Sequence, residues 1–286
     1  MIRRLGLVLA ALTMFASAAC AVVPGQKHAL EPSRSGLPFE TVAFRSAADS
    51  VGLSGWWFEG PANSPVIVFC SRGTGTMADL LPSVREMVRR GFTVFTFDYR
   101  DFGPGGPGET DSLRTLVFAT RWVFDAQGAF AFARSRAAGR HVFAWGQDLG
   151  GPVALAVGAR DARLVDAIAV EGLFRTAIEQ VEFNGTAQIP GVLPQHRLQV
   201  DTRDEPVATV PLLHVPLLAI IAMKDVVTPP EITKKLVTQS LSRIDRWVIP
   251  TAGHTGAELT PGYFDRLAGW YKGLASQLPK PARLAP

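Results

Sequence analysis

The stretch from Phe143 to Gly151 constrains the fold of this chain more strongly than any other. Its sequence, Phe-Ala-Trp-Gly-Gln-Asp-Leu-Gly-Gly, is an apolar strand that runs into a Gly-x-Asp-x-Gly turn and then into a helical pattern. The glycines on either side of Asp148 permit a sharp turn that strains the central residue and pushes its side chain clear of the sheet. The helix that follows directs its N-terminal N–H groups toward that side chain. We therefore predict a carboxylate held above the carboxyl end of a buried strand.

The rest of the chain alternates strand and helix patterns. After an opening pair of strands at 40–45 and 52–58, apolar runs predict strands at 65–70, 92–98, 141–145, 165–170, 216–222 and 244–249, and helical spacing predicts helices at 77–90, 113–137, 152–160 and 263–278. Strands separated by helices of this length join through right-handed parallel crossovers. The 286 residues are 47% hydrophobic, enough for one large core. We expect one α/β domain over residues 38–278, built on a doubly wound, mostly parallel sheet, with a short tail at 279–286.

One segment, 174–213, breaks this rhythm. It lies between two predicted strands, is rich in polar residues and contains four prolines. An insertion of this length at the carboxyl edge of a sheet predicts a small lid over whatever site lies there. The apolar residues that could pack within it favour a lid over a surface excursion; they are Phe174, Ile178, Phe183, Ile189, Val192 and Leu193.

Two further residues occupy the positions where partners of Asp148 are expected. Asp225 follows the next-to-last predicted strand, and His254 lies in the loop after the last one. Because the carboxyl ends of parallel strands meet at one edge of a sheet, the three side chains should converge there. The chain order of Asp148, Asp225 and His254 is the order of nucleophile, acid and base in α/β hydrolases.

The backbone beside Asp148 offers a candidate oxyanion hole. The N–H group of Leu149 can be one donor, and that of Gly73 or Thr74, after the strand at 65–70, can be the other. Glu171, at the end of the strand at 165–170, is a second candidate acid, although a polar strand terminus needs no catalytic role. Lys224 and Glu258 are expected to be solvated.

Residues 38–278 resemble bacterial α/β hydrolases of the serine aminopeptidase and lysophospholipase kind. The resemblance implies an α/β-hydrolase fold and hydrolysis of a small-molecule ester or amide without a cofactor. Two departures stand out: Asp148 replaces the nucleophilic serine, and Ser71-Arg72-Gly73 replaces the His-Gly that many relatives carry near the oxyanion hole. The segments that carry the resemblance are 68–70, 97–103, 146–151, 224–225 and 253–254.

Aspartate serves as nucleophile on this fold in haloalkane dehalogenases and epoxide hydrolases. The carboxylate attacks a saturated carbon, and histidine then activates water to cleave the resulting ester. Attack on an ordinary ester would instead give a strained mixed anhydride. Supporting groups of those families are missing, because Leu149 stands where a halide-binding Trp would follow the nucleophile and segment 174–213 contains no Tyr.

Two functions are compatible with these residues. One is an active hydrolase with Asp148 as nucleophile, His254 as base and Asp225 as orienting acid. The alternative is a binding protein that has lost catalysis and uses the same pocket, with Asp148 capping the following helix. Asp225 and His254 favour the hydrolase, since a degraded site would have no reason to keep them.

Residues 1–20 have the character of a leader. Arg3 and Arg4 precede an apolar run, and small residues then lead to Cys20. This ending resembles the lipobox of bacterial lipoproteins, except for Ser17 where an aliphatic residue is usual. The resemblance implies export and a lipid anchor on Cys20 in a bacterial membrane, facing the periplasm or the exterior, with 21–37 as a tether. An ordinary signal peptide, cut at Ala18 or Ala19 and leaving Cys20 unmodified or lost, is the alternative.

Composition excludes other classes of function. The net charge of +4 is scattered over the chain, which argues against nucleic acid as a partner. The five histidines are isolated and show no metal-ligand spacing, so we expect no metal site. If Cys20 is lipidated, Cys70 has no partner for an intramolecular disulfide. The sequence leaves the oligomeric state open.

Overall fold

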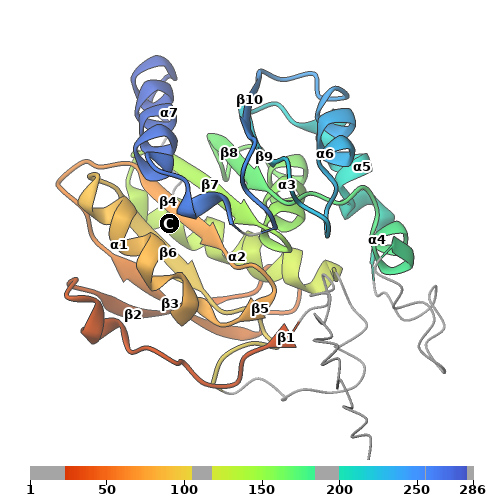
Figure 1. Ribbon diagram of the computed structural model, residues 1–286. Coiled ribbons are helices and arrows are strands. Elements are labelled where there is room, and N and C mark those ends of the chain that lie inside the picture. The colour runs from red at the N-terminus through yellow and green to blue at the C-terminus, as the bar shows by residue number, and fades with distance from the viewer. Residues whose placement is uncertain (1–22, 105–117, 184–199, 255, 282–286) are drawn as a thin grey trace, which may run out of the picture.

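The computed structural model describes residues 23–104, 118–183, 200–254 and 256–281 (Figure 1). At its centre is an eight-stranded sheet in the order β10-β9-β8-β7-β4-β6-β3-β2. Strand β3 pairs antiparallel with β2 and β6, and every other pair is parallel. The strands are β2 (Glu40–Arg45), β3 (Gly52–Phe58), β4 (Val66–Cys70), β6 (Thr93–Phe97), β7 (Val142–Gln147), β8 (Ala167–Glu171), β9 (Leu217–Ala222) and β10 (Ile244–Ile249).

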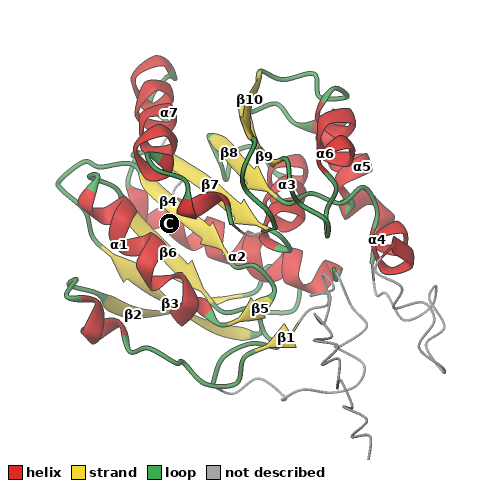
Figure 2. Ribbon diagram, in the orientation of Figure 1, coloured by secondary structure: helices red, strands yellow, loops and turns green. Residues whose placement is uncertain are grey.

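Helices cover both faces of the sheet (Figure 2). The helices are α1 (Leu81–Arg89), α2 (Thr120–Ala137), α3 (Gly150–Arg160), α4 (Ala177–Phe183), α5 (Pro206–Thr209), α6 (Pro230–Val237) and α7 (Tyr263–Gln277). Apolar residues of α1 and α7 pack on one face, whereas those of α2, α3 and α6 pack on the other. Strand β4 supplies both cores, since Val66 and Val68 face one set of helices and Ile67 and Phe69 the other. Such burial on both faces explains why β4 is apolar at every position.

The predicted doubly wound, mostly parallel sheet is confirmed, and its strand order is that of the α/β-hydrolase fold. The boundaries differ in instructive ways. Strand β7 continues to Gln147, beyond the predicted end at 145, because Gly146 and Gln147 still pair with β8. The predicted helix at 113–137 is described only from Thr120, since 105–117 lie outside the described residues. Helix α6 was not predicted; it is short and begins at a Pro-Pro pair.

The expected tether at 21–37 is not a free segment where it is described. Residues 23–37, called the strap below, lie on the domain. Strand β1 (Val23–Pro24) pairs parallel with β5 (Thr74–Gly75), and further along His28 Nε2 lies 2.7 Å from Asp98 Oδ2. The side chain of Pro32 is buried. Backbone pairing and a hydrogen bond between His28 and Asp98 therefore fasten the described part of the expected tether to the domain.

Only part of the predicted lid, 174–213, lies among the described residues. Of 174–213, only α4 and its approach lie near the carboxyl edge among the described residues. Helix α5 and the residues after it pack against α3, and Asp204 forms an ion pair with Arg160 at the far end of that helix. The segment between β8 and β9 must connect the carboxyl end of β8 to the amino end of β9. These two points lie at opposite ends of the neighbouring parallel strands. Phe174 is buried as expected but Phe183 is exposed, and 184–199 lie outside the described residues.

Within the described ranges, no helix combines the length and the apolar character needed to span a lipid bilayer.

Candidate active site

Asp148 occupies the strained turn between β7 and α3. Its φ of +50° lies in the left-handed region, which costs a residue with a Cβ about 1 kcal/mol or more. The two flanking glycines are required by space. A Cβ on Gly146 would lie 2.2 Å from the carbonyl oxygen of Gly150, and a Cβ on Gly150 would lie 2.1 Å from that of Cys70. The backbone N–H of Asp148 donates to the carbonyl of Glu171 at 2.9 Å, which ties the turn to the end of β8.

His254 lies between two carboxylates at the carboxyl edge of the sheet. Its Nδ1 is 3.0 Å from Asp225 Oδ2, and its Nε2 is 3.8 Å from Asp148 Oδ2. The first distance is a hydrogen bond, whereas the second is an ion-pair contact too long for a direct hydrogen bond. The structure thus brings together the three side chains that the sequence selected, in the predicted arrangement.

Asp225 is held rigidly by the turn that follows β9. Its Oδ1 accepts the N–H groups of Val227 and Thr228, both at 2.8 Å, and its Oδ2 accepts the hydroxyl of Thr228 at 2.6 Å. The Thr228 hydroxyl also lies 3.5 Å from His254 Nδ1. Sequence reasoning missed Thr228, although a threonine three residues after a strand-end aspartate is a usable signal for such a turn.

The charges of the site stabilise one another. Burial of His254 disfavours the imidazolium, but the carboxylates of Asp148 and Asp225 outweigh burial and raise the pKa of His254 to about 10. Burial likewise favours the neutral form of Asp225, yet the contact with His254 and the hydrogen bonds from Thr228 lower its pKa. The raised pKa of His254 therefore favours the imidazolium at neutral pH.

The predicted oxyanion hole is closed in this structure. The N–H of Leu149 donates to the carbonyl of Arg72, with an N···O distance of 3.4 Å. The carbonyl of Arg72 and the N–H of Gly73 belong to the same peptide group. Because a trans peptide points its C=O and N–H in opposite directions, the N–H of Gly73 is directed away from Leu149. Gly73 is close, since a Cβ on it would lie 2.8 Å from that of Leu149, but its donor is misdirected. Thr74 is exposed and lies in β5.

A polar cluster behind the turn fixes the position of Arg72. The Arg72 guanidinium forms an ion pair with Glu258 and donates from Nε to Gln147 Oε1 at 2.8 Å. Gln147 Nε2 donates to Glu258 Oε1 at 2.7 Å, and Ser83 donates to the other oxygen of the same carboxylate. The expectation that Glu258 is solvated is therefore wrong. Because its partners are far away in the sequence, no local sequence pattern predicted these contacts.

Glu171 is buried in the same cluster and does not contact His254. Burial raises the pKa of its carboxyl group despite the nearby Arg72, and the hydroxyl of Tyr263 donates to Oε2 at 3.3 Å. This placement agrees with a polar strand terminus. The structure gives Glu171 no place in the catalytic arrangement.

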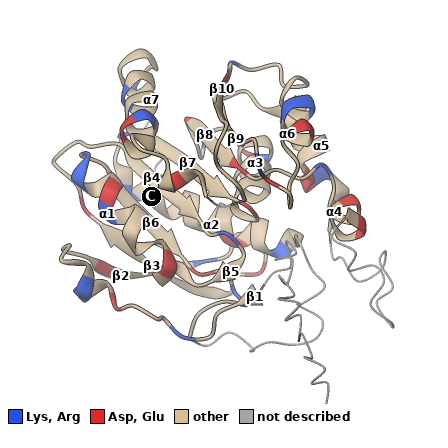
Figure 3. Ribbon diagram, viewed as in Figure 1, with Lys and Arg blue, Asp and Glu red and all other residues tan. Residues whose placement is uncertain are grey.

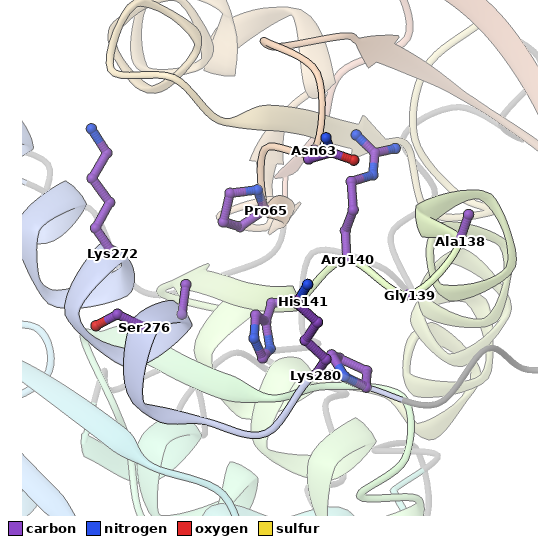
Figure 4. Close-up of a pocket in the computed structure, with 11 residues that line it drawn as sticks. Asn63, Pro65, Ala138, Gly139, Arg140, His141, Lys272, Ser276 and Lys280 are labelled. Atoms are coloured by element: carbon purple, nitrogen blue, oxygen red, sulfur yellow. The ribbon is translucent and has the colours of Figure 1, made fainter.

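A hollow of about 670 Å³ lies at the opposite edge of the sheet, near the starts of β4 and β7 (Figure 4). Arg140 on its wall forms an ion pair with Glu59 at 2.7 Å, and His141 Nδ1 lies 3.4 Å from Asp166 Oδ2. None of Asp148, Asp225 and His254 lines it, so it is separate from the candidate site. Among the described residues, no group of His, Cys, Asp and Glu side chains could hold a metal ion.

Comparison with known proteins supports the fold. The structure superposes on an esterase of Pyrococcus furiosus with a TM-score of 0.69, 16% identity and coverage of 88% of this chain and 98% of that one. An acetyl xylan esterase from Thermoanaerobacterium gives 0.60, 15% identity and coverage of 90% and 96%. A 2,6-dihydroxy-pseudo-oxynicotine hydrolase gives 0.66, 16% identity and coverage of 86% and 71%. The superpositions establish the α/β-hydrolase fold, and at identities this low they show the fold alone.

Comparison by sequence reaches less far. The chain is 29% identical over 146 residues to the uncharacterized protein YfhR of Escherichia coli O157:H7, which is 47% of each chain. The match thus spans about half the length of that curated relative. No protein-family model matches the sequence.

Proposed function

We propose that this protein is a hydrolase that acts without a cofactor and uses Asp148 as its nucleophile. The observation that carries the proposal is the position of His254 between Asp225, at 3.0 Å, and Asp148, at 3.8 Å. A binding pocket would have no need of a histidine fixed by a carboxylate that is itself held by three hydrogen bonds.

In the first step a carboxylate oxygen of Asp148 attacks a saturated carbon of a small-molecule substrate. A C–O bond forms to Asp148, and the bond to the leaving group breaks with its electron pair going to that group. An ionised carboxylate needs no base to remove a proton. The imidazolium of His254 can give its Nε2 proton to a departing oxygen, which suits an oxirane or another carbon–oxygen electrophile.

In the second step His254 acts as the base. Alkylation removes the charge of Asp148, one of the two charges that raise the pKa of His254, so the neutral imidazole is favoured after proton transfer. Its Nε2 takes a proton from water, and the hydroxide attacks the carbonyl carbon of the Asp148 ester. Release of the alcohol restores the carboxylate and the imidazolium. Asp225 keeps the ring oriented throughout.

The test is a panel of oxiranes, alkyl halides and esters presented to the wild type and to Asp148→Ala. We expect turnover by the wild type and none by the variant. Asp265→Ala is a matched control, because Asp265 on α7 is an exposed carboxylate that pairs with Arg90. This variant should keep wild-type turnover. Equal turnover by Asp148→Ala would rule out the proposed nucleophile.

A second candidate, a binding protein without catalysis, is favoured by one observation. The N–H of Leu149 is already donated to the carbonyl of Arg72, so the preformed donors of a working oxyanion hole are missing. This function predicts saturable ligand binding that Asp148→Ala weakens, without turnover or a covalent adduct for any compound of the panel.

We also propose that the chain is exported and anchored through Cys20, which lies outside the described residues. The basic, apolar and small-residue leader that ends at this cysteine supports the proposal. Metabolic labelling with a fatty acid should mark the wild type and Cys70→Ala but not Cys20→Ala. An exported product that carries no label would instead favour simple cleavage before Cys20.

A further inference from the structure

The most exposed large apolar side chains of the described residues are Leu259, Leu241 and Val226. They are 87%, 85% and 78% exposed, respectively. Val226 follows Asp225 at the carboxyl edge of the sheet, and Leu259 follows Glu258 at the same edge. Leu241 lies at the opposite edge, since it precedes β10 and the carbonyl of Arg243 accepts the N–H of Leu217 at the start of β9. Side chains with the same exposure thus sit at both ends of the strands.

Val226 and Leu259 each adjoin a residue of the candidate site or of the polar cluster behind it. Next to Val226, the carbonyl of Val227 accepts Gln180 Nε2 at 2.8 Å, which places α4 beside it. Next to Leu259, Glu258 forms the ion pair with Arg72 in the loop after β4. Leu259 therefore borders the loop that faces Leu149, and Val226 borders the turn that holds Asp225.

An exposed cation accompanies Val226. The side chain of Lys224 is exposed. Figure 3 shows residues of both charges on helices such as α1, α6 and α7. An exposed lysine two residues before an exposed valine combines the two kinds of side chain that favour an anionic lipid surface.

The polypeptide also enters the described structure at this edge. Strand β1 lies beside β5 (Figure 1), and Val23 pairs with Thr74. Thr74 follows Gly73, which lies against Leu149 beside Asp148. The N–H of Gly25 donates to the carbonyl of Gly75 and the N–H of Gly103 to the carbonyl of Gly25, both at 2.7 Å, so the strap is fastened to two loops of this edge.

The length of chain before Val23 determines where an anchor would hold the protein. Cys20 precedes Val23 by three residues, and three residues span at most about 11 Å when fully extended. An acyl group on Cys20 would thus keep the carboxyl edge, and not the opposite one, next to the bilayer. The strap leaves little freedom to turn the domain over.

We propose that the carboxyl edge of the sheet rests on the phospholipid surface in which Cys20 is anchored. Val226 and Leu259 contact lipid, Lys224 faces anionic headgroups, and Leu241 points away from the membrane. The inference rests on the lipid anchor and is independent of turnover by Asp148. It implies that substrates reach the site from the membrane surface.

The test uses the full chain, anchored in vesicles of phosphatidylethanolamine and phosphatidylglycerol. The photoreactive residue p-benzoylphenylalanine replaces Leu259 in one variant and Leu241 in a second, which is the matched control for exposure. After illumination, mass spectrometry should find phospholipid adducts at position 259 and only the level of a dark sample at 241. Neither substitution touches the triad, and equal melting temperatures would show that both variants are folded.

Three outcomes would overturn the proposal. Equal lipid adducts at 241 and 259 would mean that the domain has no fixed orientation. Absence of lipid adducts at 259 would mean that this edge does not face lipid. Adducts at 259 between two protein chains would make the edge an interface between copies. None of these results depends on catalysis, so failure here is distinguishable from failure of the Asp148 mechanism.

Discussion

The candidate site has two halves that differ in how completely they are built. In the acid–base half, Asp225 is fixed by three hydrogen bonds and holds His254 at 3.0 Å. In the oxyanion half, the N–H of Leu149 is donated to the carbonyl of Arg72, and the N–H of Gly73 points away. The first half is ready for proton transfer, whereas the second has no free pair of donors.

This difference fits the two steps of the proposed reaction. Attack of Asp148 on a saturated carbon creates no tetrahedral oxyanion, and a departing oxygen takes the Nε2 proton of His254, so the first step needs no oxyanion hole. Hydrolysis of the Asp148 ester does create one on the carbonyl oxygen of Asp148, and this second step calls for the donors. Rotation of the Arg72–Gly73 peptide would supply them. Gly73, at φ +86°, tolerates such a change at low cost because it has no Cβ.

The largest effect is expected from breaking the acid–base half at His254. In His254→Gln, steady-state turnover should fall by roughly 10⁴-fold or more, the scale seen when a triad member is removed. With an alkyl halide, whose leaving group needs no proton, the first step should continue, since the carboxylate of Asp148 needs no base. Rapid-quench mass spectrometry should therefore find the alkylated Asp148 peptide accumulating. A variant that forms no adduct with an alkyl halide would contradict this account, because His254 would then be needed for the attack itself.

A smaller effect is expected when Asp148 is replaced by serine, and it tests whether the oxyanion half limits ester hydrolysis. Asp148→Ser supplies a hydroxyl for His254 to deprotonate, so it should hydrolyse activated esters faster than Asp148→Ala. The rate should stay at least about 10²–10³-fold below that of a complete site, because each missing oxyanion donor costs that much. Rates on p-nitrophenyl acetate measure it, with Asp148→Ser/His254→Gln as the control. Ester hydrolysis that does not depend on His254 would contradict this account.

The pH dependence of stability tests the charge pattern of the acid–base half. The pKa of His254 is raised from about 6.5 in the unfolded chain to about 10, so its contribution is complete below pH 6.5 and is lost as pH rises toward 10. Removing one partner of a buried pair costs about 3–5 kcal/mol, so His254→Gln should lower the free energy of unfolding by up to that amount at pH 6. Urea unfolding between pH 6 and 10 should show the two proteins converging. A constant difference would mean that His254 is not charged in the folded state.

The smallest effect concerns the ion pair between Glu258 and Arg72, which lies behind the oxyanion half. Glu258→Gln removes the carboxylate that holds Arg72 and leaves polar partners unsatisfied, which should lower the free energy of unfolding by about 1–3 kcal/mol. The matched control is Glu231→Gln, an exposed partner of Lys234, with an expected change below about 0.5 kcal/mol. Equal losses of unfolding free energy in the two variants would mean that the ion pair between Glu258 and Arg72 stabilises the fold no more than a surface pair does.

The residues that the sequence revealed and those that it hid differ in the range of their signals. Asp148 directly follows β7, and Asp225 and His254 lie in the short loops after β9 and β10, with glycine or a turn residue beside them, so a local pattern marks each one. Arg72 and Glu258 are paired across 186 positions of sequence, and charged residues in loops ordinarily face water. The strap was missed for a related reason, because a two-residue strand such as β1 pairs through its backbone and carries no side-chain pattern. Whether the oxyanion donors are open depends on one peptide orientation, which composition does not encode.

The central claim, that Asp148 is the nucleophile, is tested most directly by following oxygen during a single turnover. The enzyme in excess is mixed with a substrate of the panel in water enriched in heavy oxygen, and the peptide containing Asp148 and the product are both analysed by mass spectrometry. Water that attacks the Asp148 ester leaves its oxygen on the enzyme, so we predict heavy oxygen in the Asp148 carboxylate and none in the first product molecules. Heavy oxygen in the first product, with an unlabelled Asp148, would show that water attacks the substrate directly and would contradict the account.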